Sequence, residues 1–415
     1  MDIAAGYKMT EVGIIPEDWK IVTIGDVINV FDGTHQTPHY VDVGVPFYSV
    51  ENLTANNFTN TKFISEEEHA LLTKKVKIEK GDVLMTRIGS VGDCKFIDWD
   101  VNASYYVSLA LLKKKSDKIS MKWFASMSKS TAFKESILSN SLQFAVPMKI
   151  NLGEISKVKF AMPSIEEQNL IADKLVEFDD FVSKIELQIS KKKKIKEGTM
   201  QQLLTGKKRL PGFDGDWMCK TIGECCSLFG RIGFRGYTKQ DLVRKHEGAI
   251  TFSPSNIYEQ VLDISNCDYI SLAKYEESPE IKVYNGDILF CKTASIGKCA
   301  IVRGLEEKAT INPQFVVLKD FKCNNYFLYY VIAFTDFQDK VKSITGGSTI
   351  PTMSQEKLKL QKIMLPPSQE EQKAIATILS DMDTEIQALE DERDKYLLIK
   401  QGVMQDLLTG KTRLV

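Results

Sequence analysis

The sequence predicts an α+β fold: two similar strand-rich domains with helices, separated by an antiparallel coiled coil of two long helices, as a pseudo-two-fold tandem duplication. Two repeated segments support this. MQQLLTGKKRL at 200–210 recurs as MQDLLTGKTRL at 404–414, identical at nine of eleven positions. PSIEEQ at 163–168 recurs as PSQEEQ at 367–372, again 204 positions later. This period is too long for a solenoid repeat and indicates one module duplicated within the chain.

Each module opens with a tryptophan, Trp19 or Trp217, followed by short runs rich in Val, Ile, Phe and Tyr. Gly, Asn and Asp interrupt these runs, a pattern typical of strands joined by turns. The predicted strand regions of the first module are 45–50, 81–97 and 105–114, and those of the second are 250–257, 286–302 and 313–320. Apolar residues at helical spacing then predict one helix from Met121 to Leu138 and one from Asn325 to Ile344.

Each module closes with a predicted helix of about 40 residues, roughly 60 Å long. Apolar residues follow heptad spacing along both helices. Ser164 and Ser368 suit helix starts, and Gly206 and Gly410 suit helix ends. The predicted coiled-coil interface comprises Ile171, Leu175, Phe178, Val182, Ile185 and Ile189 in the first helix and Ile375, Leu379, Met382, Ile386 and Leu389 in the second.

Two arrangements could bury these apolar stripes. They could face each other, which we prefer, or each helix could pack onto its own strand-rich domain. The lysine-rich run 191–196 interrupts the first stripe and suggests a solvated helix end or, less simply, a binding patch. The predicted domains are 1–162 and 208–366 for the strand-rich parts, with 163–207 and 367–415 for the central and C-terminal helical regions.

Composition indicates an ordinary soluble protein, with 43% apolar residues, 26% charged residues and a formal net charge of −1. This argues against coating nucleic acid by bulk positive charge. Eight cysteines without metal-ligand spacing suggest reduced thiols and a cytoplasmic location. The opening residues MDIAAGYKMTEVG resemble no signal peptide, and no apolar run is long enough to span a membrane.

The two modules are unevenly similar. Residues 80–94 and 285–299 share six of fifteen positions, whereas the loops at 31–40 and 229–238, matched by distance from the tryptophans, differ almost completely. One scaffold with different loops predicts two binding surfaces for different targets. A helical rod between them would hold them apart, which suits a reader of an extended, regular ligand such as duplex DNA.

With these features the chain resembles the specificity (S) subunits of type I DNA restriction–modification systems. The resemblance rests on the duplicated layout, the GDVL and GDIL strands followed by S-x-G, the PSxEEQ helix entries and the closing LLTGKxRL. It implies two target recognition domains that read a bipartite asymmetric DNA site, and no catalysis in this chain. It also implies two modification (M) subunits that use S-adenosylmethionine to methylate adenine N6, and restriction (R) subunits that use ATP and Mg.

The residues agree that this chain carries no catalytic site. The string NPQF at 312–315 is the nearest match to an amino-methyltransferase loop, but it lacks the second proline and lies in a predicted strand. TGKT at 409–412 lacks the first glycine of a phosphate loop and follows a helix, so it suits a cap. The chain has only four histidines, which makes a histidine-rich metal site unexpected. We expect no cofactor and no metal.

Candidate DNA contacts divide into phosphate-binding and base-reading groups. A cation, a hydroxyl and the amides of a glycine turn suit a phosphate, although a plain hairpin turn explains the same pattern. The phosphate candidates are Arg87, Ser90 and Gly92, and their counterparts Lys292, Ser295 and Gly297. Base-reading candidates come from the divergent loops: Thr34, His35, Gln36, Thr37, His39 and Tyr40 in the first domain, and Arg231, Arg235, Tyr237, Ser253, Ser255 and Asn256 in the second.

A third group precedes each long helix and either contacts DNA or shapes a turn: Ser141 and Gln143 in the first module, and Gly347, Ser348 and Thr349 in the second. Two other functions remain open. The chain could be the DNA-recognition part of a split single-polypeptide restriction enzyme, or a coiled-coil adaptor without a nucleic-acid role. The adaptor alternative leaves the divergence of the matched loops unexplained.

Overall fold

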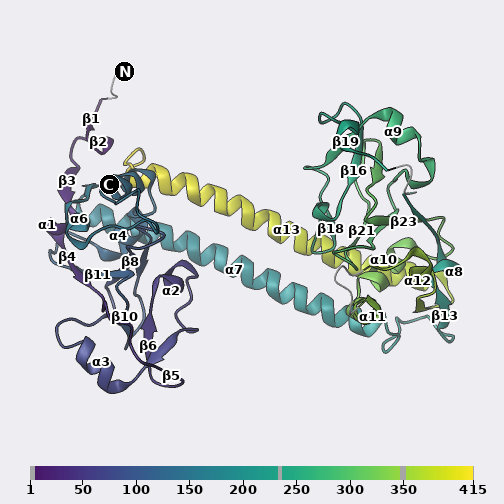
Figure 1. Cartoon of the computed structure of the whole chain (residues 1–415), viewed down its shortest axis with the longest axis horizontal. Coiled ribbons are helices and arrows are strands. Elements are labelled where there is room, and N and C mark those ends of the chain that lie inside the picture. The colour runs from purple at the N-terminus through teal and green to yellow at the C-terminus, as the bar shows by residue number, and fades with distance from the viewer. Residues whose placement is uncertain (1–4, 232–235, 346–351, 415) are drawn as a thin grey trace. The chain divides into compact units, whose positions relative to one another are not determined.

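The computed structural model describes residues 5–231, 236–345 and 352–414. The chain divides into two compact units. The first unit combines Met1–Glu186 with Asp391–Val415, and the second is Leu187–Glu390. Both ends of the chain therefore belong to the first unit (Figure 1). The domain boundaries predicted above stay predictions, because this division follows packing and cuts both long helices.

The first unit contains two four-stranded sheets, in the orders β4-β11-β8-β9 and β10-β6-β7-β5, and two strand pairs, β1-β2 and β12-β3. Its strands are β1 (Tyr7–Thr10), β2 (Gly13–Pro16), β3 (Lys20–Thr23), β4 (Ile28–Asp32), β5 (Tyr40–Val41), β6 (Val45–Tyr48), β7 (Lys62–Ile64), β8 (Val83–Thr86), β9 (Cys94–Phe96), β10 (Ser104–Tyr105), β11 (Leu109–Lys114) and β12 (Lys159–Met162). Its shorter helices are α1 (Ile24–Val27), α2 (Val50–Thr54), α3 (Glu66–Leu72), α4 (Met121–Met127), α5 (Thr131–Ser139) and α6 (Leu152–Lys157), before the long helix α7 (Ile165–Leu203).

The second unit repeats this plan. Its sheets have the orders β14-β23-β20-β21 and β15-β19-β16-β22, beside the strand pairs β13-β24 and β17-β18. Its strands are β13 (Met218–Thr221), β14 (Ser227–Gly230), β15 (Leu242–Val243), β16 (Ala249–Phe252), β17 (Ile257–Tyr258), β18 (Val261–Leu262), β19 (Asp268–Ile270), β20 (Ile288–Cys291), β21 (Cys299–Ile301), β22 (Ala309–Ile311), β23 (Phe315–Lys319) and β24 (Lys362–Leu365). The helices are α8 (Ile222–Cys225), η2 (Lys239–Asp241), η3 (Pro254–Asn256), α9 (Leu272–Glu276), η4 (Pro279–Ile281), α10 (Asn325–Ala333), α11 (Thr335–Thr345), α12 (Gln355–Lys359) and the long helix α13 (Gln369–Leu408).

The four-stranded sheets confirm the α+β tandem duplication, because each one in the first unit has a counterpart with the same strand order in the second. The sheets β4-β11-β8-β9 and β14-β23-β20-β21 are both entirely antiparallel. The other four-stranded sheet of each unit contains one parallel pair: β10 with β6 in the first unit, and β16 with β22 in the second. The predicted strand regions all contain observed strands. The NPQF string is a correction: Asn312 follows β22 and only Phe315 lies in a strand, so the string forms a turn.

Two helix predictions were wrong in the same way. The segment from Met121 forms two helices, α4 and α5, because Ser130 adopts an extended conformation and its side chain accepts the amide of Phe133 as an N-cap. The segment from Asn325 also forms two, α10 and α11, because Phe334 is extended, with φ −72° and ψ 144°. Apolar spacing continues across both breaks, so periodicity alone did not show them.

The GDVL and GDIL strands begin with a buried aspartate that closes a turn. Asp82 accepts the amide of Glu79 at 2.7 Å and the ammonium of Lys113, on β11, at 2.6 Å. Asp287 likewise accepts the amide of Tyr284 and pairs with Lys319 on β23 at 3.2 Å. Burial raises the pKa of both carboxyl groups above the ordinary value. The preceding glycine has positive φ in both copies, which an L side chain disfavours.

In the first unit, α7 and α13 pack against each other in antiparallel directions. The rings of Phe181 and Tyr396 lie 4.4 Å apart, and Lys400 pairs with Asp179, so rising numbers in α7 meet falling numbers in α13. Near its start, α7 also joins the core of its own sheet. Ile171 is fully buried in a cluster that contains strand residues together with Leu407 from the end of α13. Both predicted packing arrangements therefore hold, each over part of the helix.

In the second unit the helix pair is also antiparallel and is bordered by ion pairs. Lys192 meets Glu385 at 2.5 Å, Lys193 meets Glu390 at 2.9 Å, and Lys196 meets Asp383. The run 191–196 lies inside α7, which continues to Leu203, so its interpretation as a solvated helix end was wrong. Three of its lysines instead contact acids of α13.

The predicted coiled-coil positions are largely shielded from solvent. Eight are buried, and Phe178, Met382 and Leu389 are half-buried. The buried positions are Ile171, Leu175, Val182, Ile185, Ile189, Ile375, Leu379 and Ile386. Their residue-by-residue pairing across the two helices stays a prediction.

The glutamines of the PSxEEQ segments form hydrogen bonds between each long helix and the residues that precede a shorter helix, α4 in the first unit and α10 in the second. Gln168 is fully buried, donates to the carbonyl of Lys118 at 2.9 Å and accepts the amide of Ser120 at 2.8 Å, just before α4. Gln372 accepts the amide of Asn324, just before α10, at 2.8 Å. The serine caps are confirmed, since the amides of the glutamates three residues later donate to Ser164 and Ser368.

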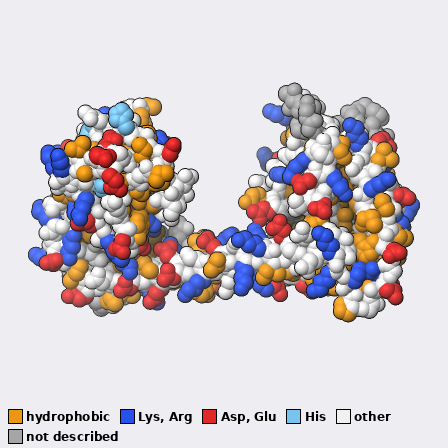
Figure 2. Space-filling model, turned by 90° about the horizontal axis from the view of Figure 1, so that it is seen from below, with side chains coloured by type: hydrophobic (Ala, Val, Ile, Leu, Met, Phe, Trp, Pro, Cys, Tyr) orange, Lys and Arg blue, Asp and Glu red, His pale blue; other side chains and the backbone are white. Residues whose placement is uncertain are grey.

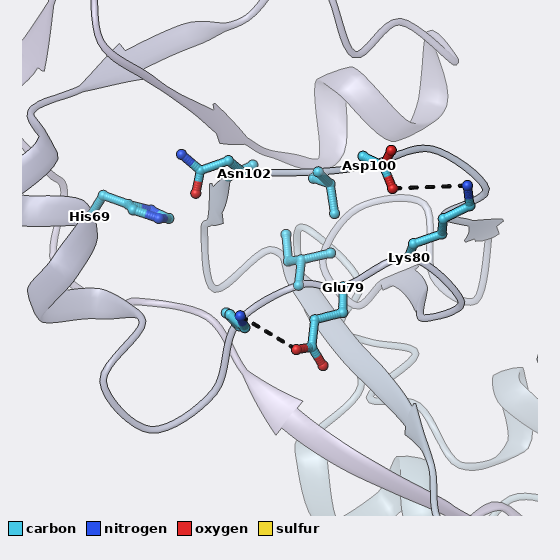
Figure 3. A pocket seen from close by; sticks show the side chains of 9 residues that line it. His69, Glu79, Lys80, Asp100 and Asn102 are labelled. Atoms are coloured by element: carbon cyan, nitrogen blue, oxygen red, sulfur yellow. Dashed lines mark ion pairs between the residues drawn. The ribbon is translucent and has the colours of Figure 1, made fainter.

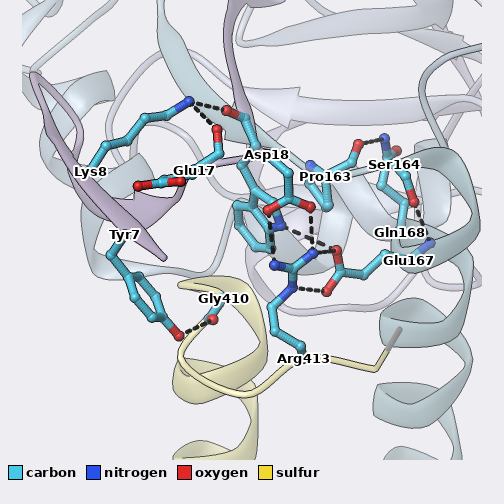
Figure 4. A network of polar contacts seen from close by, with 11 residues as sticks. Tyr7, Lys8, Glu17, Asp18, Pro163, Ser164, Glu167, Gln168, Gly410 and Arg413 are labelled. Atoms are coloured by element: carbon cyan, nitrogen blue, oxygen red, sulfur yellow. Dashed lines mark hydrogen bonds and ion pairs between the residues drawn. The ribbon is translucent and has the colours of Figure 1, made fainter. Parts of the chain in front are cut away.

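The glutamates of the same segments bind arginines from the LLTGKxRL segments, and Figure 4 shows the pair of the first unit, Glu167 and Arg413. In the first unit, Arg413 donates to Glu167 at 2.7 Å and to Asp18 at 2.7 Å, and Trp19 Nε1 also donates to Glu167 at 3.1 Å. The hydrogen bond from Arg413 lowers the pKa of Asp18. Glu167 is completely buried, so the guanidinium offsets the cost of removing its charge from water.

The second unit repeats the contact with Arg209 and Glu371, at 2.7 Å. Each unit therefore combines the helix entry of one module with the closing segment of the other. The glycine caps are confirmed, with φ +70° at Gly206 and +71° at Gly410. A Cβ at Gly410 would lie 2.4 Å from Pro16, and one at Gly206 would lie 3.4 Å from Trp217, so the tryptophan regions pack on these caps.

Candidate DNA-reading surfaces

The loop after β4 presents the first group of base-reading candidates on the surface of the first unit. Thr34 is held in place, since its amide donates to Tyr105 and its carbonyl accepts from Val107 at 3.0 Å. A Cβ at Gly33 would lie 2.5 Å from the carbonyl of Tyr106, which explains the glycine. The side chains that follow are exposed: His35, Gln36, Thr37, His39 and Tyr40. The structure brings all six candidates together in one segment.

Tyr40 is also a packing residue. Its ring meets Phe47 edge-on with centroids 6.0 Å apart, and the ammonium of Lys62 lies 4.7 Å from its centre. His35 has a polar partner, since its Nε2 lies 2.8 Å from a carboxylate oxygen of Asp32. Asp32 was not among the predicted residues. The sequence did contain a signal for this contact, because Asp32 lies three residues before His35 in the string DGTH.

The turn after β8 carries the first phosphate candidates. Ser90 is exposed and donates to Asp93. Gly92 has φ +93°, and a Cβ there would lie 2.9 Å from a side-chain carbon of Ile137. Arg87 is buried, and its guanidinium pairs with Asp32. An anion could therefore reach the turn at the exposed Ser90, whereas the guanidinium of Arg87 is already paired with Asp32.

The matching turn of the second unit differs in its cation. Lys292 lies where Arg87 lies in the first, and Gly230 occupies the place of Asp32 when positions are counted from the tryptophans. A Cβ at Gly230 would lie 3.5 Å from the ammonium of Lys292. Among the described residues, no ion pair to Lys292 is present. Ser295 is half-buried, and Gly297 has φ +88°.

The segment before α6 lies against the first of these turns. The amide of Gly89 donates to Met148 at 2.8 Å, and that of Ile150 donates to Arg87 at 3.0 Å. Ser141 and Gln143 bond to carbonyls of the preceding helix, at 2.7 and 3.0 Å, which favours a turn-shaping role for both. Sequence reasoning missed the apolar tip of this segment, where Phe144 and Val146 are 100% and 99% exposed.

Three of the second unit's candidates have structural partners. Arg231 is buried, donates to the carbonyl of Ile311 at 3.1 Å and lies 5.3 Å from the ring centre of Tyr237. Asn256 is buried and accepts the amide of Ser253 at 2.8 Å, as Asn52 accepts that of Ser49 in the first unit. This shared S-x-x-N cap was visible in the sequence, and it makes Asn256 part of the scaffold.

Ser255 is exposed, and its hydroxyl lies 2.7 Å from that of Ser253. Four other candidates lie outside the described residues: Arg235, Gly347, Ser348 and Thr349. The DNA-contact assignments of the whole set stay predictions.

A polar cavity of about 230 Å³ opens on the first unit between α3 and the segments around Glu79 and Asp100 (Figure 3). Its lysines are matched by acids: Lys80 faces Asp100 at 3.9 Å, and Lys77 faces Glu79 at 3.6 Å. His69 bonds to Ser104 at 2.9 Å. Charge balance gives the cavity no preference for an anion, and the described residues contain no group of three metal-ligating side chains.

Charges of both signs are interspersed over the face of both units in Figure 2. This matches the net charge of −1 and indicates that DNA binding would depend on local contacts. In the described residues, no helix is both long and apolar enough to cross a bilayer. All eight cysteines are free.

Comparison with known proteins agrees with this architecture. The family model described as "Type I restriction modification DNA specificity domain" matches twice, over residues 16–197 and 215–397. The MjaVIII type I restriction enzyme specificity subunit of Methanocaldococcus jannaschii is 24% identical, covering 96% of this chain and 94% of its own. The EcoBI specificity subunit of Escherichia coli is 24% identical over 43% of this chain and 38% of its own.

Solved structures show the same fold. The S subunit of a type I restriction–modification system from M. genitalium has a TM-score of 0.60 at 15% identity, covering 98% of both chains. A chain from a study of assembly and conformational transition of the type I system has a TM-score of 0.57 at 15% identity, covering 96% of this chain and 99% of that one. The double family match and the duplicated fold lead to one conclusion: the chain belongs to the type I restriction–modification specificity family and is a non-catalytic DNA specificity subunit.

Proposed function

We propose that this chain reads an asymmetric, bipartite site in double-stranded DNA, with one unit for each half-site. The observation that carries the proposal is the contrast between scaffold and loops. The antiparallel sheets of the two units have the same strand order. The loops that follow β4 and β14, at matched positions, share almost no residues. Equal scaffolds with unlike loops suit two different base sequences.

Within each unit we assign different contacts to different segments. Ser90 and Gly92, and their counterparts Ser295 and Gly297, would contact phosphate, with Lys292 supplying a cation in the second unit. The exposed loop after β4 would meet base edges in the major groove. The segments before α6 and α12, including Ser141 and Gln143, would border the same DNA. Arg87, Arg231 and Asn256 would support these surfaces from within the protein.

The long helices also offer surfaces for the methyltransferase (M) subunits. Leu398 is 70% exposed on the first unit's part of α13, and Leu187 is 70% exposed on the second unit's part of α7. Leu397, Leu398 and Ile399 are exposed in succession on α13. Neighbouring exposed apolar side chains are more typical of a binding surface than a single one. We propose that two M subunits bind the helices and that restriction (R) subunits join them. S-adenosylmethionine, ATP and Mg would bind those partners, in the cytoplasm.

Genome-wide mapping of N6-methyladenine tests the proposal. Cells with the chain and its partner subunits should carry one bipartite, asymmetric methylated motif that disappears when the chain is deleted. A variant with residues 31–40 replaced should alter one half of the motif and leave the other half unchanged. A methylation pattern that is the same with and without the chain, or a change in both halves, would contradict one unit per half-site.

A further inference from the structure

One exposed base-reading candidate, His35, is held by a chain of polar contacts that runs through Asp32 to Arg87 inside the protein. We call these three residues the relay. Asp32, the last residue of β4, uses one carboxylate oxygen for Nε2 of His35, at 2.8 Å, and the other for the guanidinium of Arg87. Exposure rises along the relay, from 10% for the side chain of Arg87 through 29% for Asp32 to 70% for His35. The inner end is therefore fixed and the outer end meets solvent.

Asp32 is also fixed through its backbone. It pairs with Ala110 in the register of β4 and β11, and its carbonyl accepts the hydroxyl of Tyr105 at 3.0 Å. Arg87 is anchored as well, since its Nε donates to the carbonyl of Ile150 at 3.4 Å. A carboxylate held from both sides gives the imidazole a defined orientation.

The chemistry of the relay selects one tautomer of the histidine. Arginine has only donors, and an ionised carboxylate has only acceptors. Asp32 therefore accepts from both neighbours, and Nε2 of His35 must carry the hydrogen. In the neutral ring this leaves Nδ1 with a lone pair and no hydrogen. Within the described part of the chain, no residue donates a hydrogen bond to this nitrogen.

We propose that Nδ1 of His35 accepts a hydrogen bond from the exocyclic amino group of one base in the first half-site, N6 of adenine or N4 of cytosine. These amino groups are the only base donors in the major groove. Asp32 and Arg87 act as positioning residues that set the tautomer. This inference rests on the proposed DNA function and adds the class of base edge that one residue recognises.

In the part of the second unit that the structure describes, the relay has no counterpart. Gly230 takes the place of Asp32, and it offers no carboxylate to hold or orient a histidine. Arg231, the next residue, is buried against Ile311. Loss of the relay should therefore affect one half-site only.

A matched pair of variants separates the two ring nitrogens. His35→Asn places an amide oxygen near the position of Nδ1 and loses the contact with Asp32. His35→Gln reaches Asp32 but has no atom at Nδ1. The probes are duplexes of the methylated motif in which one base of the first half-site lacks its amino group. Purine replaces an adenine, and pyrimidin-2-one replaces a cytosine.

For the wild-type complex with its M subunits, one such replacement should weaken binding about tenfold, the scale of one hydrogen bond. The same replacement should leave His35→Gln unaffected and should still weaken His35→Asn. Equal behaviour of the two variants, or no sensitive amino group in the half-site, would overturn the inference. A response to 7-deazaguanine instead would show a donating ring and would also overturn it.

A spectroscopic readout tests the positioning role of Asp32. In ¹⁵N-histidine spectra of the full chain, His35 should be the tautomer with hydrogen on Nε2, and Asp32→Asn should shift it toward a mixture. An unchanged His35 signal in Asp32→Asn would overturn that role. Failure of the proposed function is distinct, because the wild-type complex would then methylate no bipartite motif at all.

Discussion

At the scale of single residues, the repeated segments are explained by a few buried polar contacts. Glu167 and Glu371 are 0% and 1% exposed, and each binds one arginine, Arg413 or Arg209. Buried carboxylates are costly unless they are paired, so both members of each pair are needed together. This is the physical reason that each copy of EEQ is matched by a copy of KxRL.

Arg413→Ala should therefore destabilise the first unit by about 3 kcal/mol, because it leaves Glu167 buried without its cation. Chemical denaturation of the full chain measures the change. Lys411→Ala is the matched control: this lysine is two residues away and 75% exposed, and its pair with Asp406 should contribute less than about 1 kcal/mol. Similar losses for the two variants would mean that burial of Glu167 does not decide the effect.

At the scale of elements, α7 and α13 combine a buried stripe with a charged border. Val182 and Ile185 are buried in the first unit's part of α7, and Ile189 in the second unit's part. Lys192 and Lys193 lie beside this stripe and pair with acids of α13. Exposed ion pairs contribute little to stability. Most of the helix–helix stability should therefore come from the apolar stripe, while the charges favour one pairing of the helices.

Ile189→Ala should cost about 2–4 kcal/mol of stability, because it removes methyl groups from a buried position. Leu187→Ala, two residues earlier and 70% exposed, should change stability by less than about 0.5 kcal/mol. Both are compared by chemical denaturation. If Leu187 is instead part of the M-subunit surface, its replacement should weaken assembly with M subunits while stability is preserved. Equal destabilisation by the two variants would show that Ile189 is not in a packed interface.

At the scale of the whole molecule, each unit depends on segments that are distant in the sequence. The first unit requires the end of α13, which supplies Leu407 and Leu408, and the segment after it, which supplies Arg413. The second unit requires the end of α7, which supplies Leu203, and the segment after it, which supplies Leu204 and Arg209. The two modules of the sequence and the two units of the structure are therefore different divisions of the chain.

Deletion of residues 404–415 should consequently damage the N-terminal recognition domain and spare the C-terminal one. Hydrogen exchange of the truncated chain should show lost protection around Trp19 and Ile171. Protection around Trp217 and Ile375 should be retained, because that core is closed by residues 203–209. Loss of protection in the second unit instead would mean that each module folds with its own closing segment.

Much of the fold followed from local pattern. The strand regions, the two long helices, their serine starts and their glycine ends were all visible in the sequence, because alternation, heptad spacing and capping depend on neighbours along the chain. The breaks at Ser130 and Phe334 were not visible, since apolar spacing continues through them. Among site residues, exposure of His35 and Gln36 agreed with expectation. Burial of Arg87 and Arg231 depends on partners far away in sequence.

The sequence by itself determined that this protein is a duplicated module with one scaffold and two unlike sets of loops. Only the tertiary structure decided which copy of each repeated segment meets which. Residues 200–210 and 404–414 are nearly identical, so either could close either helix entry. The antiparallel course of the helices in each unit makes the choice, because it brings the end of one helix to the start of the other. Arg413 thus binds Glu167, and Arg209 binds Glu371.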